Sequence, residues 1–399
     1  MIESNVTAFV ILLMLAAAVA VLAERLPIPY VTALALAGVG LGAVVGPQHL
    51  HLTPSLLLFV LLPGLLFEAG FNLRWARLRV DLLTVVVLAT VGVLITTAVV
   101  AVLGVAALHL SLPLAVLFGA MIAPTDPVAV VGVFRRLGVP ERLATIVEAE
   151  SLLNDGTGVV IFTIALAAMT LPSPSFPVVL LQFVRLALGG LALGLAIGVA
   201  LSWLTTRIDH PHVELTFTAI GAYGSYLLAE ALQVSGILAV VVAALVLGNY
   251  GRPRGMAERT EAAVTAFWDY VAFLLNSAVF LLIGLDIPWE TIAAHVPAVL
   301  LATVIVMVAR AAAVYGIFGP ARLLGRAFSW RWQHLIFWSG MRGAVAIALV
   351  LSLAEQGGPD LDLVRALVYG VVLLSIVIQG GTIGPLSAAL LPHGAAAKA

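Results

Sequence analysis

The sequence predicts an all-α membrane protein with about 13 transmembrane helices. Composition is the first observation: 62% of the 399 residues are hydrophobic and only 10% are charged, whereas about a quarter of an average soluble domain is charged. The second observation is that apolar runs of roughly 20 residues, the length that crosses a bilayer, recur along the whole chain. The third is that the few charged residues inside these runs fall in a small number of motifs.

The predicted spans are joined by short loops, so the 1–399 chain is interpreted as a single transmembrane domain. The first apolar run lacks a basic n-region and a clear cleavage site, and it is therefore expected to be a helix rather than a signal peptide. The spans cover approximately residues 6–24, 28–46, 52–72, 80–103, 111–134, 143–171, 177–205, 213–231, 234–250, 262–284, 293–318, 330–355 and 363–391.

The distribution of basic residues predicts the orientation. With the N-terminus outside, every lysine and arginine falls on the inner side except Arg185, Arg310, Arg342 and Arg365. This bias follows the positive-inside rule and predicts a multi-pass protein of the cell (inner) membrane, surrounded by membrane lipids, with a cytoplasmic C-terminus. A net charge of −1 excludes a nucleic-acid footprint. The chain contains no cysteine, and we expect no cofactor.

Charged side chains inside spans are functional candidates, because a charge at the bilayer centre costs on the order of 3 kcal/mol. In the fifth span, Pro124 and Pro127 bracket Thr125 and Asp126. Proline removes a backbone donor and clashes with the preceding turn, so this helix is expected to unwind beside protein or water. The alternative is a simple proline kink in which Asp126 caps the next half-helix.

The sixth span places Glu150, Ser151, Asn154 and Asp155 within an arc of about 140° on one helix face. A face with two carboxylates, an amide and a hydroxyl cannot meet lipid, so it must face the bundle interior. Oxygen ligands suit hard cations, a preference that we extend from calcium and magnesium to sodium. A purely structural polar network is the alternative.

The twelfth span carries Arg342 between Gly340 and Gly343, which indicates a second interrupted helix. It lies seven spans after the first interrupted helix, so the two cross the membrane in opposite directions. Paired broken helices of opposed direction are typical of inverted-repeat transporters. Arg342 and Asp126 would then offset the partial charges of the half-helix ends. The alternative is a helix-packing glycine motif in which Arg342 pairs structurally.

Arg310 and Glu150 each lie roughly 10–12 Å from the inner end of their span, so they are the best internal ion pair. Glu150 as the proton carrier is the alternative. Glu68 lies close to Arg74, and it either snorkels to the surface, lines an inner funnel or touches the ion. Asn249 and Asn276 are expected to form hydrogen bonds between helices.

Taken together, these motifs resemble the monovalent cation:proton antiporter-1 family, in particular its NhaP-type sodium/proton antiporters. The resemblance covers essentially the whole chain in order. The motifs that carry it are Phe67–Gly70, Ala123–Pro127, Glu150–Gly156, Phe267–Gly284, Ala309–Arg310, Gly340–Gly343 and Gln379–Gly380.

The resemblance implies an NhaA-like antiporter fold and a homodimer. It assigns ion-translocating core helices to about 80–171 and 293–391, and interface helices to parts of about 6–72 and 177–284. It implies sodium at Asp155, Asp126, Ser151 and Thr125, with Glu68 assisting. With the arguments above, Asn154, Glu150, Arg310 and Arg342 are expected to be structural or charge-compensating. An asparagine at position 154 resembles the electroneutral branch of the family, whereas electrogenic relatives carry two aspartates in this motif. By the same resemblance, Arg310 occupies the position of a titrating lysine in the electrogenic branch.

The expected function is exchange of sodium or lithium for protons, one for one, by competition at Asp155. Burial disfavours an ionised carboxylate and a bound cation favours it, so one carboxylate can hold either guest but not both. A potassium/proton antiporter of the same mechanism is the alternative, and a cation channel is a further one. An aspartyl protease built on Asp126 and Asp155 lacks its Gly-x-Gly-Asp motif, so we expect no enzyme.

Overall fold

A computed structural model of the chain describes residues 2–23, 25, 28–45, 53–170, 175–208, 210–323, 328–354 and 359–391. Within these ranges all regular secondary structure is helical. Seven described helices are long and apolar enough to cross a membrane, and shorter apolar helices fill most of the other predicted spans. The all-α membrane fold class is therefore confirmed. Of the basic residues assigned to the inner side, Arg326 and Lys398 lie outside the described ranges.

The helices follow the order of the predicted spans. The first half of the chain contains α1 (Ile2–Ala23), α2 (Tyr30–Val45), η1 (Leu56–Leu61), α3 (Leu62–Asn72), α4 (Trp75–Val87), η2 (Leu88–Gly92), α5 (Val93–Leu108), α6 (Leu112–Ile122), α7 (Val128–Leu137), α8 (Glu141–Thr170) and α9 (Phe176–Thr205). The second half contains α10 (Pro211–Ala219), η3 (Ile220–Gly224), α11 (Ser225–Ala231), α12 (Gly236–Val246), η4 (Leu247–Gly251), α13 (Arg252–Gly255), α14 (Glu258–Leu285), α15 (Trp289–Ala294), α16 (Val296–Leu323), α17 (Trp330–Trp338), α18 (Ala344–Ala354), α19 (Pro359–Leu374), η5 (Ser375–Gln379) and α20 (Gly380–Leu390). The η elements are short π-helical segments that continue their neighbouring α-helices.

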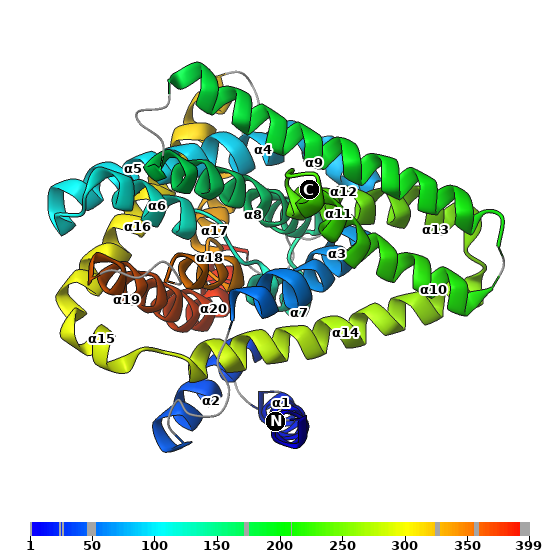
Figure 1. Cartoon of the computed structure of the whole chain (residues 1–399), viewed down its shortest axis with the longest axis horizontal. Coiled ribbons are helices and arrows are strands. Elements are labelled where there is room, and N and C mark those ends of the chain that lie inside the picture. The colour runs from blue at the N-terminus through cyan, green and yellow to red at the C-terminus, as the bar shows by residue number, and fades with distance from the viewer. Residues whose placement is uncertain are drawn as a thin grey trace.

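The helices form two groups. Figure 1 shows α5, α6 and α16–α19 on one side of the molecule and α9–α13 on the other, with α14 along one edge. Beyond α14 lie α1 and α2, which pack against it. The long helix α8 runs between the two groups and contacts α4, α6, α9 and α12. The polar face of α8 therefore lies in the interior of the molecule. This is the position expected for a face that cannot be exposed to lipid.

Small residues allow the closest helix contacts. Gly190, Gly194 and Gly198 follow one another at four-residue spacing along α9, and they meet α12 and the Ser235 residue that caps it. A β-carbon at position 194 would lie only 2.3 Å from the carbonyl oxygen of Ala239. Small residues at this spacing let two backbones approach in a membrane, where no hydrophobic force distinguishes helix from lipid.

Both predicted helix interruptions are present. Residues 123–127 separate α6 from α7, and residues 339–343 separate α17 from α18. The two unwound segments touch, because the backbone amide of Asp126 donates to the carbonyl oxygen of Met341 over 2.8 Å. Proline explains the first interruption, since neither Pro124 nor Pro127 can donate a helical hydrogen bond. The crossing brings four half-helix ends into the interior.

Candidate functional site

Each of the four half-helix ends faces a side chain of opposite charge. The exposed carbonyl groups at the C-terminal end of α6 accept from Arg342, whose Nη1 lies 2.6 Å from the oxygen of Ala123 and 3.2 Å from that of Pro124. At the C-terminal end of α17, Arg310 Nη2 donates to the oxygen of Ile336 over 2.9 Å. These guanidinium groups offset the negative ends of the two helix dipoles. The compensation by Arg342 was predicted, whereas the contact of Arg310 with α17 was not.

The positive ends converge on Asp126. Its Oδ1 accepts from the amide of Val128 at the start of α7 over 3.0 Å, and the amide of Ala344 at the start of α18 also faces this carboxylate. Gly343 has to be a glycine here, because a β-carbon at that position would lie 2.0 Å from Asp126 Oδ2. Asp126 thus accepts from the first amide of the following half-helix, the capping contact that the alternative interpretation of this motif supposed, although the helix is interrupted rather than merely kinked. A second half-helix shares the same carboxylate.

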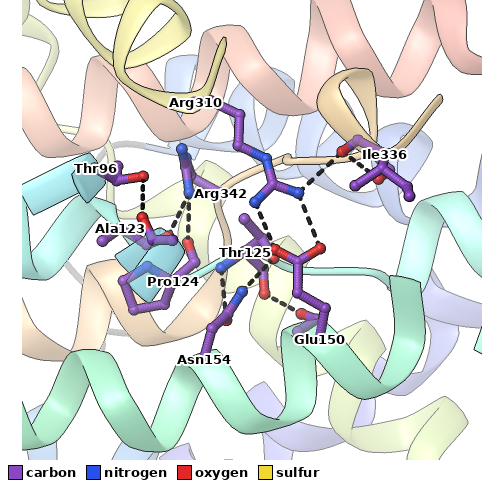
Figure 2. Close-up of polar contacts among 12 residues, drawn as sticks. Thr96, Ala123, Pro124, Thr125, Glu150, Asn154, Arg310, Ile336 and Arg342 are labelled. Atoms are coloured by element: carbon purple, nitrogen blue, oxygen red, sulfur yellow. Dashed lines mark hydrogen bonds and ion pairs between the residues drawn. The ribbon is translucent and has the colours of Figure 1, made fainter. Parts of the chain in front are cut away.

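The polar face of α8 holds the unwound segment in place. Asn154 Oδ1 accepts from the amide of Thr125 over 3.1 Å, and Asn154 Nδ2 donates to the Thr125 hydroxyl over 2.8 Å. The Ser151 hydroxyl donates to the carbonyl oxygen of Thr125. Figure 2 shows the side chain of Asn154 extending from its helix toward Thr125. The amide at position 154 thus bonds to both the backbone and the side chain of residue 125.

Glu150 and Arg310 form the buried ion pair that their matched depths predicted. The two carboxylate oxygens accept from Arg310 Nη1 over 2.5 Å and from Nη2 over 3.0 Å. Both side chains are buried, Glu150 to 1% exposure and Arg310 to 4%. Figure 2 shows the guanidinium held between Glu150 and the Ile336 carbonyl. Both oxygens of Glu150 are therefore occupied by a permanent cation.

Asp155 lies in a different environment, although it is on the same helix five residues further on. It lines a cavity of about 70 Å³ together with Asp126, Ser151 and Thr125. Within the described part of the chain, Asp155 receives no hydrogen bond from a neighbouring side chain, and its charged neighbour is Asp126. Most of the lining is apolar, but the few polar groups converge on a space that has room for water or a small cation. The four predicted ion-site residues are thus brought together around one small space.

Two polar residues that the sequence analysis did not assign to the site also line this cavity: Glu148 and Asn276. Asn276 on α14 was expected to bond to another helix, but its Oδ1 is buried without a hydrogen-bond partner among the described residues. Asn249 does bond between helices, donating to the oxygen of Leu73 over 2.8 Å. The expectation is therefore confirmed for Asn249 and wrong for Asn276.

Glu148 connects the small cavity to a larger one. The second cavity, of about 330 Å³, is lined by Glu148 and by basic residues that include Arg74, Arg77 and Arg135. Glu148 precedes Asp155 by seven residues, which is two helical turns, so both carboxylates lie on the same face of α8. That spacing was readable in the sequence, but Glu148 was not among the charged residues considered within the spans.

Glu68 does not line either cavity. Its carboxylate accepts from Asn72 Nδ2 over 2.7 Å, and Asn72 lines the larger cavity. Glu148, Asp269 and Arg135 are its charged neighbours. The structure therefore places Glu68 beside the larger cavity rather than among the residues around the Asp155 carboxylate.

Comparison with known proteins agrees with this architecture. Residues 10–389 match the family described as the transmembrane sodium/hydrogen exchanger. The chain is 41% identical over 393 residues to the Na⁺/H⁺ antiporter ApNhaP of Aphanothece halophytica, covering 96% of this chain and 74% of that one. It is 38% identical over 345 residues to the Na⁺/H⁺ antiporter NhaP of Pseudomonas aeruginosa, covering 82% and 78%.

The fold also matches a solved structure. The sodium proton antiporter MjNhaP1 of Methanocaldococcus jannaschii superimposes with a TM-score of 0.82 at 24% identity, covering 98% of this chain and 99% of that chain. The predicted antiporter fold is confirmed by this likeness. Members of the matched family are exchangers and not enzymes, in agreement with the sequence analysis. With the family matching almost the full length of the chain, this protein belongs to the transmembrane sodium/hydrogen exchanger family.

Proposed function

We propose that this protein exchanges sodium or lithium for protons across the membrane, and that the two cations compete for Asp155. One observation carries the proposal: Asp155 lines a small, mostly apolar cavity and has no arginine partner among the described residues, whereas Glu150 on the same helix is neutralised by Arg310. Burial disfavours the ionised form of such a carboxylate unless a proton or a metal cation accompanies it. The names of the relatives, all Na⁺/H⁺ antiporters, support sodium as the cation.

The oxygen atoms around the cavity suit a monovalent hard cation. Asp155 supplies the exchangeable charge, and Asp126 supplies a second carboxylate that two helix N-termini stabilise. The Thr125 carbonyl has two lone pairs, so it can accept from Ser151 and still coordinate an ion. In this proposal Glu68 and Glu148 attract the cation toward Asp155, and Asn276 supplies an amide oxygen from the opposite wall.

The exchange is proposed to be electroneutral. Guanidinium groups do not exchange protons in proteins and amides carry no charge, so neither Arg310 nor Asn154 supplies a second proton to the cycle. Each sodium ion that binds Asp155 then displaces one proton. Alternating access delivers whichever cation is bound to the other side, and the inward side is the one with the arginine-rich loops. A homodimer in the cell membrane completes the proposed assembly.

The test is proton flux by the purified protein in liposomes that contain a pH-sensitive dye. Saturable flux is expected with sodium and lithium, with one proton moved per cation and no dependence on an imposed membrane voltage. Flux with potassium alone would replace sodium by potassium in the proposal. Voltage-driven exchange would contradict one-for-one stoichiometry, and a non-saturating, ohmic current would indicate a channel.

A further inference from the structure

A third cavity, of about 340 Å³, lies between α4 and α8 on one wall and α9 and α12 on the other. Its lining is almost wholly apolar and includes Leu78 and Leu82 of α4, Leu188 of α9, and Leu238 and Val241 of α12. The volume is within the range of small-molecule sites. An apolar space of this kind does not retain water, so an apolar group is the occupant that suits it.

The two hydroxyl groups in the lining have no capacity to recognise a polar ligand by donating to it. Thr90 donates to the oxygen of Val86 over 2.7 Å, and Thr157 donates to that of Leu153 over 3.1 Å. Each hydroxyl proton is therefore used within its own helix. The chemistry of the lining fits a hydrocarbon chain rather than a metabolite with several polar groups.

The cavity opens toward the region that lipid occupies. Val86 of α4 is 39% exposed and Leu188 of α9 is 59% exposed, and both line the cavity from opposite walls. Exposed aliphatic side chains on spans that cross a membrane face acyl chains. An acyl chain can therefore enter sideways between α4 and α9, without passing through water.

One end of the cavity carries the groups that meet a lipid headgroup. Trp75, which also lines the cavity, is 41% exposed at the first residue of α4, and tryptophan is enriched at membrane–water interfaces. Arg79 follows one helical turn later, so it lies on the same side of the helix. Arg77 is paired with Glu141 over 2.5 Å, whereas exposed Arg79 makes no ion pair with a described residue.

We propose that this cavity holds one acyl chain of an anionic phospholipid whose phosphate lies at Arg79. Arg79 and Trp75 lie within one turn of each other at the start of α4, where a long arginine side chain reaches back toward the membrane surface, and the apolar chamber extends deeper along the helix. This arrangement matches the order of polar headgroup and hydrocarbon in the lipid. The site also reaches the ion cavity, because Leu152 of α8 lines both spaces. The acyl chain packs against the back of the helix that carries Asp155. The proposal depends only on membrane insertion and holds whichever cation is transported.

The test uses the intact protein in phosphatidylcholine vesicles that contain phosphatidylglycerol with a photoreactive diazirine on one acyl chain. After illumination and digestion, mass spectrometry locates the adducts. We expect adducts to concentrate on the cavity walls and to fall at least three-fold in Arg79→Gln. The matched control is Arg259→Gln, an exposed arginine at the start of α14, which should not change the yield. Adducts spread evenly over exposed helices would overturn the proposal.

Two further arms separate the lipid from other occupants. Ala187→Trp fills the cavity from α9, and it should lower the adduct yield as strongly as Arg79→Gln while the melting temperature shows that the protein folds. Equal labelling by a phosphatidylcholine probe would overturn the role of Arg79. Because the chain contains no cysteine, Leu188→Cys reports contact between two copies. Efficient disulfide formation there without lipid adducts would overturn the lipid assignment in favour of a second subunit.

Discussion

Glu150 and Asp155 are two carboxylates five residues apart on α8 that have opposite environments. Glu150 is 1% exposed and accepts two hydrogen bonds from Arg310. Asp155 borders a cavity and has no arginine partner within the described residues. Five residues correspond to a rotation of about 140°, so one helix presents its carboxylates to different surroundings. The same functional group therefore meets an arginine at one position and a cavity at the other, which is the basis for proposing a fixed charge at Glu150 and an exchangeable one at Asp155.

This difference implies that removing the charge of Glu150 and removing the charge of Asp155 have different consequences. A buried ion pair that loses one partner leaves an uncompensated charge, which destabilises a protein by about 3–5 kcal/mol. A carboxylate that exchanges a proton for a metal cation is never left with an uncompensated charge, because one bound cation replaces the other. Removing Glu150 should therefore affect folding, and removing the charge of Asp155 should affect transport.

The largest effect on transport is expected for Asp155→Asn. The amide occupies the same volume but can neither release a proton nor carry the charge that a cation must neutralise. Sodium-dependent proton flux in liposomes should fall to the level of empty vesicles, with the melting temperature nearly unchanged. Asp362→Asn, an exposed residue on α19, is the matched control and should retain full flux. Robust cation-dependent flux in the Asp155 variant would contradict the competition mechanism.

The second prediction concerns Glu150→Ala, which should lower stability by about 3–5 kcal/mol because Arg310 remains buried without its partner. Thermal unfolding in detergent measures this as a fall in melting temperature. Sodium affinity of the surviving folded protein should change less. Glu258→Ala, at an exposed position of α14, controls for the loss of a carboxylate. An unchanged melting temperature with lost sodium affinity would instead move Glu150 into the ion site.

Much of the difference between Glu150 and Asp155 could be predicted from the sequence, because it depends on local helix geometry and on depth in the membrane. Prolines at 124 and 127 break a helix wherever it packs, and helical spacing fixes the relative directions of Glu150 and Asp155. Matched depth in the membrane was sufficient to pair Glu150 with Arg310. These inferences require only the boundaries of the predicted spans and the geometry of a single helix.

The remaining part of the site depends on packing between distant spans. Asn276 lies more than 100 residues after Asp155 in the chain, and nothing in its own helix shows that α14 covers the cavity. The position of Glu68 beside the larger cavity depends in the same way on how α3 meets α8. Glu148 differs, because its seven-residue spacing from Asp155 was a sufficient local signal.

The third prediction concerns the glycine at which the two broken helices meet. In Gly343→Ala the new β-carbon would lie 2.0 Å from Asp126 Oδ2, so the carboxylate or the backbone has to move. Overpacking costs about 1–3 kcal/mol, which corresponds to roughly a 5- to 150-fold change in an equilibrium. Sodium affinity measured from flux should fall within that range. Gly132→Ala on α7 is the control, because its β-carbon meets nothing within 4 Å.

The smallest effect is expected for Glu148→Gln, which tests whether a third carboxylate on α8 acts at a distance. Two turns of helix place it about 10 Å from Asp155, where a unit charge contributes roughly 1–2 kcal/mol at an effective dielectric constant near 20. Salt and Arg135, 4.0 Å away, reduce this further. The KM for sodium should rise about two- to five-fold with little change in kcat, and less at high ionic strength. Glu141→Gln is the control, because that residue lines the same larger cavity but is already paired with Arg77. A lost kcat at saturating sodium would show instead that Glu148 takes part in the exchange itself, and the division of α8 into one fixed and one exchangeable carboxylate would then be incomplete.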